Sequence, residues 1–112
     1  MARAFYQESL ALLGGMGHKR GITECLEALA KIACAQGQTK WTARVYGATE
    51  ALREDIGIPL LPPDRPIYDR AIVALRAALD GEAFAIAWAA GRMMTLEQAI
   101  GYALEEPVSN AM

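Results

Sequence analysis

Histidine and cysteine are scarce in this 112-residue chain, which contains one histidine and two cysteines. A structural zinc site needs about four nitrogen or sulfur ligands, and His18, Cys25 and Cys34 cannot supply them within one chain. The two cysteines are nine positions apart in one expected helix. At roughly 100° and 1.5 Å per residue they face opposite sides, about 13 Å apart along the axis, which excludes a disulfide between them. We expect two reduced thiols, no metal and no cofactor.

The chain also lacks an excess of positive charge and a long hydrophobic run. Its formal net charge is −2, without the basic patch that is typical of nucleic-acid binding. The longest apolar run, at residues 83–91, is far shorter than the roughly 20 residues that cross a bilayer. No signal-peptide pattern starts the chain. The sequence therefore predicts a cytoplasmic protein in which this segment binds neither nucleic acid nor membrane directly.

The residue patterns of catalytic sites are missing as well. His18 has no serine or cysteine at a spacing that suggests a nucleophile pair. Glu105 and Glu106 are adjacent, so they do not share a helix face. The glycine-rich stretch Gly14–Gly17 lacks the lysine and Ser/Thr of a phosphate loop, and we interpret it as a flexible turn between helices. The sequence predicts a protein that is not an enzyme, with no catalytic residues.

Alanine is abundant, with 22 copies, and 54% of all residues are hydrophobic. Alanine has the best intrinsic helix propensity, and a domain of this length can bury a core without disulfides or metals. Apolar residues that recur every three or four positions predict helices, expected at residues 2–13, 19–36, 39–56, 65–79, a short segment carrying 84–91, and 95–107. Residues 56–61 are the only weak candidate for a strand. We expect one domain over residues 1–106 and a frayed tail over 107–112.

Glycine, proline and capping residues predict where these helices end. Gly14-Gly15 and Gly37 suit the left-handed turn that closes a helix. Three prolines between positions 59 and 63 forbid helix there, and Asp64 is well placed to cap the helix that follows. Thr95, with a glutamine three positions later, forms a capping-box pattern. The helices on either side of Gly37 should thus form an antiparallel hairpin.

Small residues at helical spacing indicate how that hairpin packs. Alanines let two helix backbones approach at the short end of the usual range of 8–10 Å. The small residues at this contact are Ala30, Ala33, Ala43 and Ala48. The helix at 19–36 has a wide apolar surface, which needs neighbours on two sides, as in a stack of hairpins.

An internal similarity favours the same architecture. The stretches ARAFYQESLALL from Ala2 and ARVYGATEAL from Ala43 both begin with Ala-Arg and place an aromatic residue, Phe5 or Tyr46, three positions after the alanine. The offset is 41 residues, which is about one helix pair with its connections. Self-similarity at such a period is typical of stacked helical hairpins.

The hairpin around Gly37 resembles a tetratricopeptide repeat. The residues at its motif positions, with the second helix shifted by about a residue, are Leu26, Leu29, Ala30, Ala33, Ala43 and Tyr46. It departs from the motif in lacking a tryptophan at the first position and a closing proline, and its period is longer than the usual 34 residues.

Three longer stretches carry a more specific resemblance: HKRGITECLEALAKIACAQGQ, ARVYGATEALREDIGIPLLPPDR and AFAIAWAAGRMMTLEQAIGYALEE. Over Ala4–Glu106 the chain is similar to the C-terminal end of the helical-repeat region in LuxR-type bacterial transcriptional regulators with an ATPase core, and in related signal-transduction ATPases. The resemblance implies an all-α fold of about six helices, with antiparallel hairpins stacked as a short tetratricopeptide-like α-solenoid. It also implies a noncatalytic module for protein–protein interaction, cut from such a regulator or signalling ATPase.

Two surfaces are candidate binding sites. In the tetratricopeptide register, one stripe of the helix at 19–36 faces an inner groove for a protein or peptide partner, and it consists of Glu24, Glu27, Lys31 and Cys34. The alternative is an ordinary solvated helix face. The first helix offers an apolar side for self-association into a homodimer, which consists of Phe5, Leu10 and Leu13. The alternative is that this helix is simply an unpaired end within a longer regulator.

Overall fold

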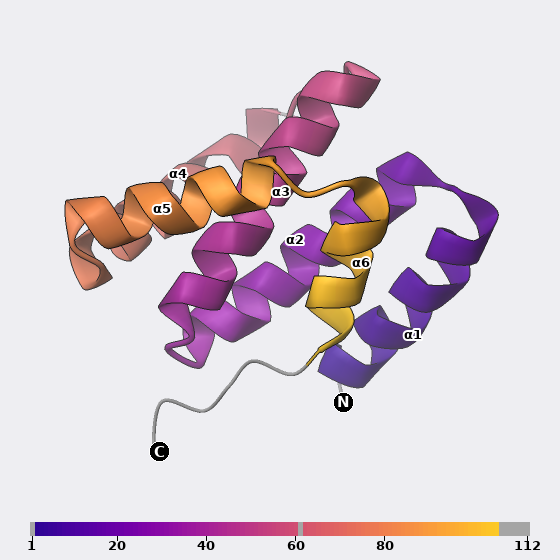
Figure 1. The fold of residues 1–112 in the computed structure, drawn as a ribbon, viewed down its shortest axis with the longest axis horizontal. Helices are drawn as coiled ribbons and strands as arrows, with labels where there is room; N and C mark the ends of the chain where they lie inside the picture. Colours follow the sequence, from indigo (N-terminus) through magenta and orange to yellow (C-terminus); the bar gives the residue numbers. More distant parts are fainter. Residues whose placement is uncertain (1, 61, 106–112) are drawn as a thin grey trace.

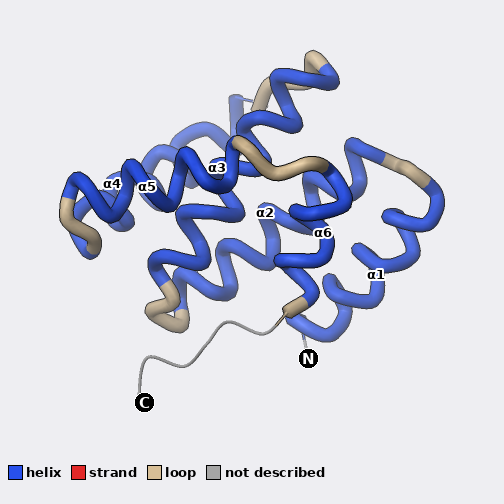
Figure 2. Tube along the Cα trace, in the orientation of Figure 1, coloured by secondary structure: helices blue, strands red, loops and turns tan. Residues whose placement is uncertain are grey.

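The computed structural model describes residues 2–60 and 62–105, and within them it contains six α-helices, one 3₁₀ turn and no strand (Figures 1 and 2). The elements are α1 (Ala2–Met16), α2 (Lys19–Ala35), α3 (Thr39–Ile56), the 3₁₀ turn η1 (Pro62–Asp64), α4 (Arg65–Ala78), α5 (Gly81–Arg92) and α6 (Leu96–Leu104). The predicted all-α class is confirmed. The weak strand candidate is wrong over its described part, because α3 runs to Ile56 and residues 58–60 have no regular structure. The expected tail at 107–112 lies outside the described residues.

Helices α2 and α3 form the antiparallel hairpin that the sequence predicts. Gly37 turns between them with a φ of +79°, a conformation that glycine adopts without steric cost. Lys19 at the start of α2 forms an exposed ion pair with Asp55 at the end of α3, as expected where two helices run antiparallel. The predicted apolar stripe of α2 is buried against its neighbours, and it consists of Ile22, Leu26, Leu29 and Ala33.

Helix α5 crosses α3 at very close range, through a pair of glycines. A Cβ atom added to Gly91 of α5 would overlap the carbonyl oxygen of Arg44, and one added to Gly47 of α3 would overlap that of Trp88. Each helix therefore presents a glycine to the backbone of the other. The sequence reasoning anticipated close packing through alanines but did not single out Gly47 or Gly91 for this crossing.

Helix α6 folds back onto the first half of the molecule, where it contacts α1, α2 and α3 (Figure 1). Ala99 and Ala103 of α6 are buried, and Tyr102 stacks on Trp41 of α3 with ring centroids 5.8 Å apart. The predicted capping box at Thr95 is confirmed, since its hydroxyl accepts from the Gln98 backbone and the Gln98 side chain accepts from the Thr95 backbone. The chain reversal thus brings the end of the described sequence against its beginning.

The predicted end of the first helix was wrong. Helix α1 continues through Gly14-Gly15 to Met16, and the left-handed turn falls at Gly17, whose φ is +67°. The physical reason is tertiary: Gly14 lies against Ile100 of α6, where an added Cβ would come within 3.2 Å of the isoleucine side chain. A glycine inside the helix is tolerated because two other helices pack against α1.

Three helix starts show how the caps differ. His18 precedes α2, and its Nδ1 accepts a hydrogen bond from the Gly21 amide at 3.0 Å, a role that the sequence reasoning missed. Asp80 caps α5, because its Oδ1 accepts from the Ala83 amide at 2.7 Å. Asp64 occupies the predicted cap position of α4, but its side chain accepts no capping hydrogen bond.

No helix within residues 2–60 and 62–105 combines the length and the apolar character that a bilayer crossing demands.

Candidate functional site

Two adjoining cavities lie where α2, α3, α4 and the segment before α4 meet. Their volumes are about 390 Å³ and about 260 Å³. The residues that line both are Glu27, Arg53, Pro59, Leu60 and Tyr68. Because they share these walls, we treat the two cavities as one feature, the groove.

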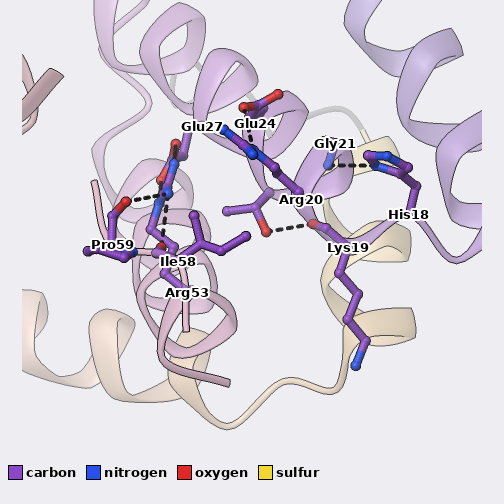
Figure 3. Close-up of polar contacts among 10 residues, drawn as sticks. His18, Lys19, Arg20, Gly21, Glu24, Glu27, Arg53, Ile58 and Pro59 are labelled. Atoms are coloured by element: carbon purple, nitrogen blue, oxygen red, sulfur yellow. Dashed lines mark hydrogen bonds and ion pairs between the residues drawn. The ribbon is translucent and has the colours of Figure 1, made fainter. Parts of the chain in front are cut away.

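An ion pair between α2 and α3 belongs to the lining of both cavities, and Figure 3 shows its two side chains. Arg53 donates from Nε to Glu27 Oε2 at 2.7 Å and from Nη2 to Glu27 Oε1 at 2.6 Å. The side chains are only 17% and 12% exposed. Such a bidentate pair is geometrically specific and stronger than a neutral hydrogen bond. It raises the pKa of Arg53, chiefly through the hydrogen bonds to Glu27, so the guanidinium stays charged.

The same arginine holds the wall of the groove in place. Its Nη1 donates to the carbonyl oxygens of Ile58 at 3.2 Å and Pro59 at 3.4 Å (Figure 3). Prolines keep this segment from forming helix, so its backbone carbonyls are free to accept these bonds. Arg53 thus ties α2, α3 and residues 58–59 together at one point.

Two tyrosines form the inner part of the groove. The ring of Tyr46 on α3 meets the ring of Tyr68 on α4 edge-on, with centroids 5.3 Å apart. Burial raises the pKa of both phenols, so both hydroxyls remain neutral at physiological pH. The hydroxyl of Tyr46 is buried and has no hydrogen-bond partner in the described part of the chain. A buried donor without a partner carries a free-energy cost.

The sequence-predicted groove residues are brought together only in part. Glu24, Glu27 and Lys31 line the smaller cavity. Cys34 lies one turn further along α2, half-buried against the core, and lines neither cavity. Glu24 also lies near Arg20, with a separation of 3.6 Å in an exposed pair.

Sequence reasoning missed the residues that complete this site. Arg53 and Tyr68 were not among the candidate site residues, and Tyr46 was noted only as a motif position. A charge on α3 that pairs with Glu27 leaves no local signal, because the two residues are 26 positions apart. The prolines around residue 60 were the only hint that a non-helical segment would form a wall.

The structure leaves only part of the predicted self-association face exposed. Leu10 is fully buried by the chain's own helices, and Leu13 is half-buried against the core beside Gly21. Phe5 is 63% exposed. The other exposed apolar residues on α1 are Leu12 at 71% and Met16 at 73%.

The groove contains acids, bases and phenols. Among the residues that the structure describes, no group of three or more His, Cys, Asp or Glu side chains is close enough to hold a metal ion. The lining places hydrogen-bond donors and carbon walls side by side, a mixture that is typical of ligand sites.

Comparison with known proteins gives a distant similarity to bacterial regulators. Proteins from Mycobacterium bovis and from two strains of Mycobacterium tuberculosis are each 32% identical to this chain over 84 residues. Each is named "putative HTH-type transcriptional regulator". The match covers 75% of this chain but only 10% of each relative. No family model matches the chain, and no solved structure matches it. The similarity fits a segment of a larger transcriptional regulator.

Proposed function

We propose that this chain is a noncatalytic helical module of a bacterial, cytoplasmic transcriptional regulator, and that it binds a protein or peptide partner in the groove. The observation that carries the proposal is the groove itself, which is held by the buried Glu27–Arg53 pair and by the bonds from Arg53 to residues 58–59. The similarity to mycobacterial regulators supports the part of the proposal that places the module in a bacterial transcriptional regulator.

The groove has the properties of a recognition site built on a rigid scaffold. Its larger cavity, at about 390 Å³, falls within the range of about 300–1,000 Å³ that is typical of ligand sites. Its walls come from three helices and a pinned segment, so little order has to be created on binding. It lies beside Glu27 and Lys31, where the tetratricopeptide resemblance implies an inner groove.

The proposed architecture is a short tetratricopeptide-like array. Helices α2 and α3 form one hairpin, α4 and α5 follow in the chain as the proposed second pair, and α5 crosses α3 at close range. The groove then lies between the first helices of two successive pairs, with residues from α2 and α4 facing one another. This is where stacked helical hairpins place their binding surfaces. Helix α6 closes the other side by returning to α1.

A selection experiment tests the proposal without knowledge of the partner. A random octapeptide library displayed on phage is selected on the chain and then screened on two variants. Leu60→Glu places a charge in the groove, and Val73→Glu places the same charge on the exposed outer side of α4. We expect selected clones to lose binding on Leu60→Glu and to keep it on Val73→Glu. Failure to select any clone, or clones that bind both variants equally, would contradict the proposal that the groove binds peptides.

A second candidate function is self-association through α1. Phe5, Leu12 and Met16 are spaced by seven and four residues, which places them on one face of the helix, and all three are more than 60% exposed. A second copy could cover this stripe through a two-fold contact between α1 helices.

Sedimentation velocity over a concentration series tests self-association. We expect the chain to dimerise and Leu12→Gln to shift it toward monomer, since a polar side chain removes apolar surface from the contact. Ile86→Gln, at a similarly exposed position on α5, is the matched control and should leave the dimer unchanged. A chain that is monomeric at all concentrations would rule out this role.

A further inference from the structure

We infer that the groove recognises a peptide segment in which a carboxylate side chain lies within two positions of a bulky apolar side chain. The apolar side chain enters the larger cavity, and the carboxylate meets Lys31 and the hydroxyl of Tyr46 in the smaller one. This inference rests on the proposed function and adds the chemistry of the partner.

The larger cavity suits an apolar group because each charged side chain in its lining already has an ion-pair partner, with Arg92 shared by Glu50 and Glu54. Its walls are mostly carbon surface, which includes Pro59, Leu60 and Tyr68. Every charged side chain in its lining takes part in an ion pair. These pairs are Glu27 with Arg53, Glu50 and Glu54 with Arg92, and Arg65 with Asp69. An apolar side chain would bury carbon surface there without stripping a free charge of its water.

The smaller cavity differs because one cation in its lining forms no ion pair with any residue that the structure describes. Arg20 lies beside Glu24, and Arg53 holds both carboxylate oxygens of Glu27. Lys31 is one turn from Glu27 on α2, but both carboxylate oxygens of Glu27 accept hydrogen bonds from Arg53 instead. Within residues 2–60 and 62–105, Lys31 forms no ion pair within 4 Å.

The remaining acid in that lining, Asp64, is compensated by the fold. It stands at the N-terminus of α4, where the helix dipole favours a negative charge, and it is among the acids whose field acts on Arg53. Lys31 is therefore the charge that an incoming group would neutralise, and that group must be an anion.

Tyr46 gives a second, independent reason to expect that the ligand places a hydrogen-bond acceptor in the smaller cavity. It lines the smaller cavity, it is 1% exposed, and its hydroxyl has no partner among the described residues. A neutral phenol donates one hydrogen bond. A carboxylate has two oxygens, so it can accept from Tyr46 while it pairs with Lys31.

The two subsites are close enough for one short peptide. The cavities meet at the Glu27–Arg53 pair and share five lining residues. In an extended chain, side chains two positions apart point the same way, at about 3.3 Å of rise per residue. An acidic and an apolar residue within two positions can therefore enter both cavities at once.

The sequences of groove-dependent phage clones give the first test. Among clones that lose binding on Leu60→Glu, we expect enrichment of Asp or Glu within two positions of Leu, Ile, Phe, Met or Trp. Groove-dependent clones without that pairing would overturn this inference while the proposed function stands. An absence of groove-dependent clones would instead overturn the proposed function.

Synthetic peptides give the second test, by fluorescence polarisation. The probes are the most enriched sequence and the same peptide with its acid changed to the amide. We expect Lys31→Gln and Tyr46→Phe each to weaken binding of the acidic peptide by about tenfold, as for the loss of a hydrogen bond to a charged group. The amide peptide should bind the wild type and both variants with similar, weaker affinity. Lys40→Gln, an exposed lysine that lines neither cavity, is the control and should change nothing.

Stability distinguishes a binding role from a structural one. Tyr46→Phe removes a hydroxyl that has no partner in the described part of the chain, so the free chain should unfold at the same temperature or higher. A Tyr46→Phe chain that is clearly destabilised, or Lys31→Gln binding the acidic peptide as tightly as the wild type, would overturn the inference.

Discussion

At the scale of single residues, glycine sets the distance between α3 and α5. Gly47 and Gly91 each face the other helix's backbone, where any Cβ atom would overlap a carbonyl oxygen. Glycine inside a helix costs about 1 kcal/mol relative to alanine, so two such residues lower the intrinsic stability of these helices. The close approach they permit lets the backbones and the flanking alanines pack tightly.

We expect Gly91→Ala to destabilise the chain by at least about 2 kcal/mol, because overpacking forces two backbones apart. Gly101→Ala is the matched control, since no atom of the described residues lies within 4 Å of a Cβ at that exposed position of α6. At Gly101 the higher helix propensity of alanine relative to glycine should stabilise the helix by up to about 1 kcal/mol. Urea denaturation of both variants measures the difference, and equal effects in the two would disprove the close crossing.

At the scale of helices, the cap side chains act differently at successive elements. Asp80 accepts a short hydrogen bond from the Ala83 amide, and Thr95 takes part in a reciprocal capping box. Asp64 has the right residue type at the right position but makes no such bond. The 3₁₀ turn that leads into α4 puts Asp64 at φ −87° and ψ −18°, which is helical backbone rather than the extended geometry of Asp80. A cap needs that extended backbone to aim its oxygen at the first amides.

Asp80 and Asp64 therefore allow a matched comparison of an N-cap aspartate with and without a capping hydrogen bond. Asp80→Ala should lower the free energy of unfolding by about 1 kcal/mol, the usual value of an N-cap bond. Asp64→Ala should change it by less than about 0.5 kcal/mol, as is usual for surface positions without such a bond. Thermal unfolding followed by circular dichroism gives both values. A larger loss at Asp64 than at Asp80 would show that the caps are wrongly assigned.

At the scale of the whole molecule, the core joins elements from both ends of the described sequence. Leu10 of α1, Tyr46 of α3 and Ala103 of α6 belong to one buried cluster. Titratable groups are part of it: burial raises the pKa of Cys25, Tyr46 and Tyr68 above their usual values. For each of these groups the neutral form is the one that the fold accommodates.

Stability should consequently fall in alkali. As pH rises above the ordinary pKa values of about 8.5 for Cys and 10 for Tyr, the unfolded chain releases these protons while the folded chain retains them. The unfolded state then binds fewer protons, so the free energy of unfolding decreases with pH, by up to about 1.4 kcal/mol per pH unit and group. Urea midpoints at pH 8 and pH 10.5 measure this loss. Tyr46→Phe should reduce the slope, and an unchanged slope would show that Tyr46 ionises normally in the fold.

Much of the secondary structure could be predicted from the sequence. The antiparallel helices around Gly37, the capping box at Thr95 and the ends of α3 depend on residues within about four positions of one another. Glu24, Glu27 and Lys31, which line the smaller cavity, were also named from a local pattern, because they lie on one stripe of a helix. The end of α1 was mistaken because the glycines at 14 and 15 carried a local signal for termination that packing against α6 overrode.

The sequence by itself determined the helices, their caps and turns, and the absence of a disulfide between Cys25 and Cys34. Helix propensity, apolar spacing and capping are set within a few neighbouring residues, so they can be read along the chain. Only the tertiary structure decided that Arg53 joins Glu27, that Leu10 is buried, that Gly47 and Gly91 face opposite backbones, and that α6 returns to α1. These features are contacts between residues 26 or more positions apart in the chain, or they depend on helices that such contacts hold together. Such contacts form only where the global packing of the helices brings the residues together, so no local pattern specifies them.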